Sequence, residues 1–136
     1  MRTRILGIDP GSQITGYGII DMDGNHASHI AHGVIQVQGE DQGAKLHLIF
    51  AQLGRVISEH QPDEAAIERV FIHRNADSAL KLGQARGAAI VACVEHSLPV
   101  YEYTANQVKQ ATVGKGHAQK AQVQHMIKVL LCLDAM

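Results

Sequence analysis

The sequence lacks any apolar run that approaches the roughly 20 residues of a membrane-spanning helix. Its N-terminus also lacks the charged and apolar leader that is typical of a secretory signal. Only two cysteines occur, Cys93 and Cys132, and both lie in apolar helical patterns that favour a small buried thiol over a disulfide or a nucleophile. We therefore expect neither export nor a disulfide framework, and the composition fits a reducing cytoplasm.

Net charge is also nearly absent, at −1 at pH 7, but the two halves of the chain differ in sign. Residues 1–68 carry four Lys/Arg against nine Asp/Glu, whereas residues 69–128 carry eight against three. Nucleic-acid binding needs a basic face rather than a basic total, so the second half could supply it. At 136 residues the chain has the usual size of one domain, and we predict a single domain over 1–136.

The nine histidines show no zinc motif, because no helical or Cys-paired ligand spacing occurs among them. His26, His29 and His32 share one predicted strand. Side chains alternate along a regular strand, so a spacing of three residues does not bring them together. We therefore do not predict a zinc site.

Apolar patterns predict an α/β fold in the order strand, strand, strand, helix, strand, helix, strand, helix, helix. The first three strands are joined by short connections, one of them the turn Asp23-Gly24, and so pair as an antiparallel meander. Later strands, reached through helices, are expected to run parallel to the first in a mixed five-stranded sheet. The predicted strands are 5–8, 15–25, 26–39, 62–71 and 98–103, and the predicted helices are 44–60, 75–96, 104–114 and 117–132.

Two acidic residues stand near the carboxyl ends of predicted strands. Asp9 ends the first strand and Glu68 lies in the fourth, and a right-handed crossover would align those ends side by side. Paired carboxylates repel one another unless a cation lies between them, and oxygen ligands of this kind suit Mg²⁺ or Mn²⁺. A metal held in this way serves phosphate chemistry, by activating water and stabilising the leaving oxygen.

Each of these acids also has a structural interpretation. Asp9-Pro10-Gly11 is an ordinary β-turn pattern, in which the aspartate side chain accepts backbone hydrogen bonds. Glu68 could instead pair with Arg69 or Arg74, although Arg69, as the next residue of the strand, would point to the other face. Convergence at one sheet edge favours the metal interpretation of both.

The helix predicted over 75–96 begins at Asn75, a plausible N-cap, and its second half is apolar almost all round, which predicts burial on several sides. Gly83 and Gly87 stand one turn apart and would allow another helix to approach closely. Two arrangements remain open: self-association of two copies through Ala79, Leu80, Gly83 and Gly87, or close packing on the chain's own sheet.

Four segments together resemble one known family. They are "GIDPGSQITGYGII", "IERVF", "NADSALKLGQARGAAIVA" and "YTANQVKQATVGKGHAQKAQVQHM", and they cover nearly the whole chain in order. In these segments the chain is similar to the RuvC family, the bacterial Holliday-junction resolvases of the ribonuclease H-like superfamily. The resemblance implies a ribonuclease H-like fold and a homodimeric, cytoplasmic endonuclease that cuts two strands of a four-way DNA junction symmetrically with two Mg²⁺ ions.

The resemblance also implies roles for particular residues. Asp9 and Glu68 match catalytic acids that contact metal, and Phe71 matches an aromatic residue that stacks on bases, with a place in the core as its alternative. Lys109 and Lys120 match basic residues that meet the DNA backbone, and Lys115 lies in the glycine-rich loop between them. RuvA and RuvB, the branch-migration proteins, are partners implied by resemblance alone.

The chain departs from the family after "LLCL", where relatives continue into a final helix whose acidic residues complete the metal site. Asp134 falls short of those positions, so we expect a domain without its final helix and, as an alternative function, a module that binds junctions without cutting them. Two other classes are weaker matches: an actin-like or sugar-kinase-like ATP-binding domain needs two lobes, and a YqgF-type nuclease lacks the "NADSALKLGQARG" helix.

Overall fold

A computed structural model describes residues 2–24, 26–69 and 75–104. The predicted helices over 104–114 and 117–132 lie outside the described residues, as do Phe71, Lys109, Lys115, Lys120, Cys132 and Asp134. The described elements are β1 (Arg2–Asp9), β2 (Ile14–Asp23), β3 (His26–Gln36), α1 (Gln42–His60), β4 (Glu64–Arg69), α2 (Ala76–Glu95) and β5 (Val100–Thr104).

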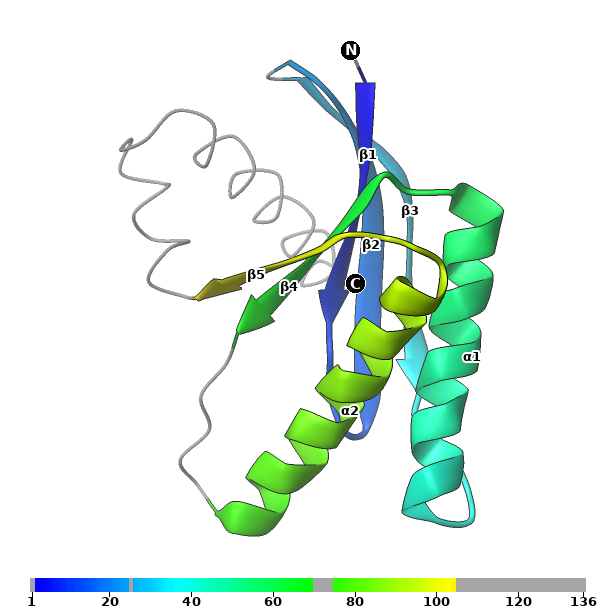
Figure 1. The fold of residues 1–136 in the computed structure, drawn as a ribbon, viewed down its shortest axis with the longest axis vertical. Helices are drawn as coiled ribbons and strands as arrows, with labels where there is room; N and C mark the ends of the chain where they lie inside the picture. Colours follow the sequence, from blue (N-terminus) through cyan, green and yellow to red (C-terminus); the bar gives the residue numbers. More distant parts are fainter. Residues whose placement is uncertain (1, 25, 70–74, 105–136) are drawn as a thin grey trace.

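The strands form one five-stranded sheet in the order β3-β2-β1-β4-β5 (Figure 1). β1, β2 and β3 pair antiparallel, as their short connections require, whereas β4 pairs parallel to β1 and β5 parallel to β4. The predicted mixed sheet is therefore confirmed. Its central feature for function is that β1 and β4 are neighbours.

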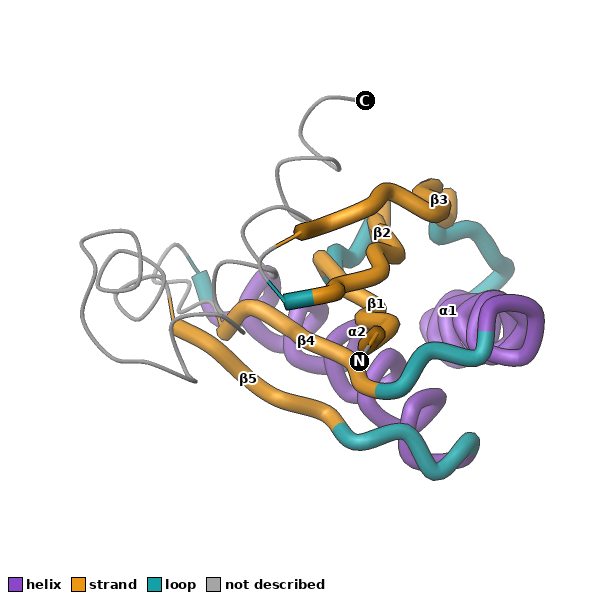
Figure 2. The backbone as a smooth tube through the Cα atoms, turned by 90° about the horizontal axis from the view of Figure 1, so that it is seen from above, coloured by secondary structure: helices purple, strands orange, loops and turns teal. Residues whose placement is uncertain are grey.

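Both described helices cover the same face of the sheet, where they build the core (Figure 2). Alternate residues of the central strands, such as Leu6, Ile8 and Ile67, are fully buried against apolar residues of α1 and α2. α2 contributes small side chains, Ala85, Ala89, Ala92 and Cys93, which let the helix approach closely. Cys93 is fully buried, which confirms the predicted buried thiol, and this burial raises the pKa of the thiol to about 12.

Side-chain caps define where the helices begin. The Asp41 side chain accepts a 2.8 Å hydrogen bond from the Ala44 N–H, and the Asn75 side chain accepts one of 2.7 Å from the Ser78 N–H. The Asn75 cap is as predicted. α1 begins at Gln42, two residues before the predicted start, because the Asp41 side chain satisfies a backbone N–H of the first helical turn.

Within one copy of the chain, the second half of α2 is not buried on several sides, contrary to the prediction. Val91 is 54% exposed and Val94 is 64% exposed, so α2 contributes only one face to the core. None of the described helices is long and apolar enough to cross a membrane.

Candidate metal centre

Asp9 and Glu68 stand next to one another at the carboxyl ends of β1 and β4. The parallel register pairs Ile8 with Ile67, so the next residue of each strand is one of the two acids. Adjacent paired strands lie about 4.8 Å apart, so the two acids directly follow a pair of residues at about that spacing. The predicted convergence of the two acids at one edge of the sheet is therefore confirmed.

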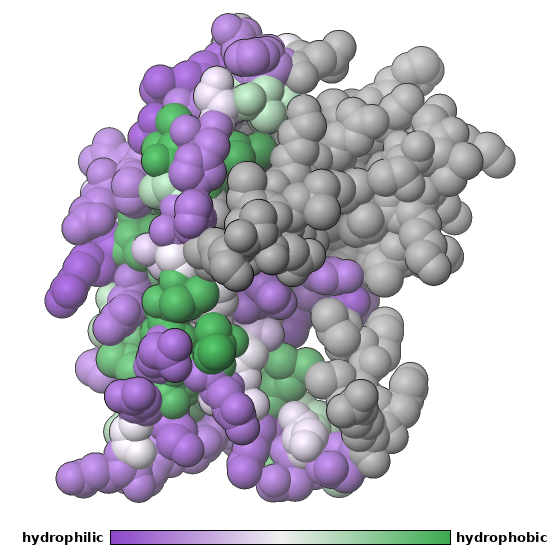
Figure 3. Space-filling model, turned by 180° about the vertical axis from the view of Figure 1, so that it is seen from behind, coloured by the Kyte–Doolittle hydropathy of each residue, from purple (hydrophilic) through white to green (hydrophobic). Residues whose placement is uncertain are grey.

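The two carboxylates belong to the face of the sheet opposite α1 and α2. Ile8 and Ile67 point into the helix-covered core, and side chains alternate along a strand, so Asp9 and Glu68 project to the other side. Asp9 is exposed and Glu68 is half-buried. Figure 3 views the molecule from behind, where apolar residues are interspersed with polar ones on the described surface.

Three glycines lie beside Asp9, two on the neighbouring strand β2 and one on β1 itself. Gly16 of β2 is paired with Asp9, and Gly18 is paired with Gly7 one step earlier on the same face. None of the three glycines contributes a side chain beside the carboxylates, and all three are buried. Glycine inside a strand often marks a place where a ligand or another backbone approaches closely. The alternating glycines of "TGYG" are the sequence signal for this stretch, and they were not among the predicted site residues.

The turn after Asp9 is held by a buried threonine. The Gly11 N–H donates to Thr15 Oγ1 at 3.2 Å, and the Thr15 hydroxyl donates to the Gly11 carbonyl oxygen at 3.0 Å. Thr15 is fully buried, and the Val37 N–H donates to the Gln13 carbonyl at 2.9 Å, which ties the same loop to the end of β3. These bonds fix the backbone that carries Asp9.

Gly11→Ala is expected to lower the free energy of unfolding by about 1–3 kcal/mol, the usual cost of forcing extra atoms into a packed site. A Cβ at Gly11 would lie 2.2 Å from the Ile14 carbonyl oxygen, which is backbone and cannot turn aside. Urea unfolding followed by circular dichroism measures the change. Gly43→Ala is the control, because its Cβ would meet only Asp41 Oδ1 at 3.5 Å; equal stability of the two variants would contradict this account of the turn.

The donor set at this edge fits Mg²⁺. This cation prefers oxygen ligands and is usually held by one or two carboxylates together with several waters and substrate phosphate oxygens. Within residues 2–24, 26–69 and 75–104, no group of three or more His, Cys, Asp or Glu is placed to hold a metal ion. Glu64 lies on the same strand and face as Glu68 but about 13 Å away, too far to share an ion.

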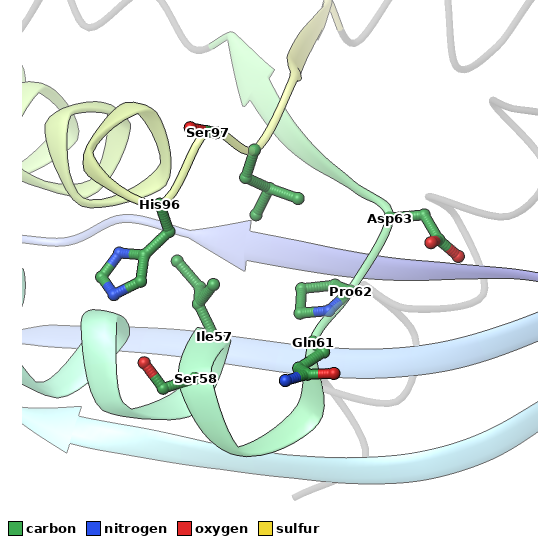
Figure 4. Close-up of a pocket in the computed structure, with 8 residues that line it drawn as sticks. Ile57, Ser58, Gln61, Pro62, Asp63, His96 and Ser97 are labelled. Atoms are coloured by element: carbon green, nitrogen blue, oxygen red, sulfur yellow. The ribbon is translucent and has the colours of Figure 1, made fainter.

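A polar hollow of about 470 Å³ lies elsewhere, at the amino ends of β4 and β5 (Figure 4). Its walls include Pro62 and Asp63 before β4 and His96 after α2. Glu68 lies towards the opposite end of β4, and Asp9 lies at the carboxyl end of the neighbouring β1. The hollow is therefore separate from the candidate metal centre.

The predicted contact residues of α2 are open to the outside. Ala79, Leu80 and Gly83 are exposed and Gly87 is half-buried. No neighbouring element of the described chain comes within 4 Å of a Cβ built at Gly83 or Gly87. Packing of these glycines on the chain's own sheet, one of the two arrangements left open by the sequence, is therefore wrong.

This sheet order, with helices on one face and acids at the ends of β1 and β4, defines a ribonuclease H-like domain. The family model described as crossover junction endodeoxyribonuclease RuvC matches residues 5–136. The chain belongs to the RuvC family.

Relatives and solved structures agree with this assignment. The crossover junction endodeoxyribonuclease RuvC of Shewanella baltica is 58% identical over 131 residues, which cover 96% of this chain and 76% of the relative. The structure of T. thermophilus RuvC in complex with a Holliday junction substrate matches at a TM-score of 0.74 and 25% identity, covering 91% of this chain and 89% of that one. The yeast mitochondrial Holliday junction resolvase Ydc2 shares the fold, with a TM-score of 0.59, 12% identity and coverage of 88% and 61%.

Proposed function

We propose that this protein resolves Holliday junctions by Mg²⁺-dependent, symmetrical hydrolysis of DNA phosphodiesters in recombination and repair. The observation that carries the proposal is the placement of Asp9 beside Glu68 in a chain that is 58% identical to a crossover junction endodeoxyribonuclease. A bacterial cytoplasmic location is proposed on the likeness to RuvC proteins of bacteria.

Asp9 and Glu68 would hold the cation through their carboxylate oxygens, with Mn²⁺ as a substitute for Mg²⁺. When bound, the cation would lower the pKa of a water nucleophile and stabilise the leaving oxygen. Asp9 is exposed, so its carboxylate can reach a cation at the surface, whereas the neighbouring Gly16 and Gly18 are buried. The Gly11–Thr15 hydrogen bonds hold the backbone of Asp9 in position while the phosphate binds.

Contacts with DNA are proposed for four residues outside the described ranges. Phe71 would stack on bases near the crossover, and Lys109, Lys115 and Lys120 would contact phosphates. Two observations support these contacts. The segments that hold the four residues match the family pattern, and residues 69–128 carry a net positive charge.

A second candidate function is junction binding without cleavage. Two carboxylates supply few fixed ligands for the two-ion geometry of in-line displacement, and the described residues offer no larger cluster. In this alternative the fold and the basic second half still recognise the junction.

We also propose that two copies associate through the predicted contact residues Ala79, Leu80, Gly83 and Gly87, extended along the same helix face by Val91 and Val94; these six residues are called the α2 stripe. Their spacings of three and four residues place them on one helix face, and Leu80 is 60% exposed. Exposed apolar side chains around two glycines favour a close helix–helix contact. RuvA and RuvB remain proposed partners, on family resemblance alone.

Gly83→Glu is expected to convert the dimer to a monomer, because two-fold pairing would bring two unpaired carboxylates together in a dry contact. We expect the dissociation constant to rise by about 100-fold or more, the equivalent of a few kcal/mol. Light scattering after size-exclusion chromatography measures the state. Ser78→Glu adds the same charge on the opposite side of α2 and should leave the dimer intact; a Gly83→Glu dimer of unchanged affinity would rule out the stripe.

The function is tested with a labelled four-way junction and a linear duplex of the same sequence, each incubated with the protein in Mg²⁺ or in chelator. Metal-dependent nicks in the junction support the resolvase. Junction-selective binding without nicks supports the second candidate. If the protein neither cuts nor prefers the junction, both proposals fail.

A further inference from the structure

Two histidines of the edge strand β3 converge, against the prediction from their spacing. The pairing of β2 with β3 shifts between Ile19–Ala31 and Ile20–His29, so Ile30 has no partner and forms a β-bulge. A bulge inserts one extra residue, which turns a spacing of three into an effective spacing of two. His29 and His32 therefore share one face of the sheet.

The two imidazoles meet at their nitrogens. His29 Nε2 and His32 Nδ1 lie 2.8 Å apart, and the ring centroids are 4.9 Å apart with the planes tilted by 53°. Both residues are exposed, and β3 is an edge strand, so solvent reaches the pair from the side. Which ring donates depends on the tautomer.

We propose that His29 and His32 form a bidentate site for a divalent transition-metal cation of the Ni²⁺ and Cu²⁺ class. Imidazole nitrogen is a preferred ligand of these ions, which bind in square or tetragonal geometry. Metal–nitrogen bonds of about 2.05 Å at a right angle separate the two nitrogens by about 2.9 Å, close to the observed 2.8 Å. The pair thus has the spacing that chelation needs before the metal arrives.

Metal binding at this pair requires one proton to change its position. In the hydrogen-bonded pair one proton lies between Nε2 of His29 and Nδ1 of His32. Chelation requires a lone pair on both nitrogens, so the donor ring moves its proton to its outer nitrogen and both rings remain neutral. The two metal–nitrogen bonds then replace one hydrogen bond between exposed groups, which by itself contributes little to stability.

The site is distinct from the carboxylate centre and goes beyond the proposed function. His32 pairs with Gly18, and Gly18 with Gly7, which lies two residues before Asp9. His32 is therefore two strand spacings across the sheet and two residues along β1 from Asp9, which gives a Cα–Cα distance of about 12 Å. One ion cannot bridge the two sites, so each can be tested alone.

Calorimetric titration with Ni²⁺ tests the proposal on the full chain. Asp9→Asn serves as the background, so that binding at the carboxylates does not contribute. In that background, His29→Gln and His32→Asn should each weaken the site by about tenfold or more, because each removes one of two ligands. His26→Gln is the matched control, since His26 is exposed on the same strand but alternation places it on the opposite face.

Melting curves confirm that the exposed substitutions leave the fold intact. Loss of the same Ni²⁺ site in both His29→Gln and His32→Asn, with His26→Gln unchanged, supports the proposal. Ni²⁺ affinity that is equal in all variants, or lost equally in His26→Gln, overturns it. Neither result depends on whether the chain cuts DNA.

Discussion

Asp9→Asn is expected to lower the rate of Mg²⁺-dependent junction cleavage by about 1,000-fold, while junction binding in chelator changes by less than about threefold. Asparagine keeps the shape of the side chain but removes the charge that holds the cation, and metal-ion stabilisation contributes several kcal/mol to phosphate chemistry. Single-turnover cleavage of a labelled junction measures the first quantity, and a mobility-shift titration measures the second.

Glu68→Gln should reproduce the Asp9→Asn result, and the double variant should be hardly slower than either single one. The two side chains hold the same ion at adjacent positions of β1 and β4, so their effects cannot add. Glu64→Gln is the matched control, because Glu64 lies on the same strand and face but near the other end. If the Asp9→Asn variant cleaved the junction at the wild-type rate, Asp9 would not be a ligand of the metal centre.

Arg4→Met is expected to lower the free energy of unfolding by about 2–4 kcal/mol at neutral pH. The Arg4 guanidinium makes two bonds to the Asp21 carboxylate, at 2.7 and 3.0 Å, and a third of 2.8 Å to the His60 carbonyl at the end of α1. Asp21 is only 8% exposed. Removing Arg4 leaves the nearly buried Asp21 carboxylate with the largely exposed Arg2 guanidinium, 3.4 Å away, as a weaker partner, and this loss of compensation is the main cost.

The same pair makes the stability depend on pH. The hydrogen bond from Arg4 holds the pKa of the Asp21 carboxyl below its usual value, against burial, which acts in the opposite direction. A lowered folded-state pKa stabilises the fold above the unfolded-state value of about 3.9, and this contribution is lost as pH falls through the folded-state pKa. Wild type should therefore lose stability below about pH 4, and the gap to Arg4→Met should narrow there.

Urea unfolding at pH 7 and at pH 3 measures both effects. The double variant Arg4→Met/Asp21→Leu should recover much of the lost stability, because an apolar pair leaves no buried charge. A single variant as stable as wild type at pH 7 would show that the ion pair does not stabilise the fold.

The sheet could be predicted because its order follows from local features. The turn at Asp23-Gly24 and the short connections dictate an antiparallel meander, and the crossover rule places β4 beside β1. Asn75 was identifiable as a cap because it precedes a helical pattern directly. The convergence of Asp9 and Glu68 followed from the same topology.

Other features depended on pairing register, which the sequence does not show. Arg4 and Asp21 meet because β1 and β2 align them opposite one another. The bulge at Ile30 brings His29 to His32, and no residue pattern announced it. The exposed valines of α2 were expected in the core from composition alone, because composition does not show which face of a helix packs on the sheet. The roles of Phe71 and the three lysines stay predictions.

The most direct test of the resolvase account maps the nicks in a four-way junction whose four strands are labelled one at a time. With Mg²⁺, the account predicts nicks at symmetrical positions in two strands, no nicks in chelator and none in the linear duplex. Equal cutting of junction and duplex, cutting without metal, or a bound junction that stays intact would contradict it.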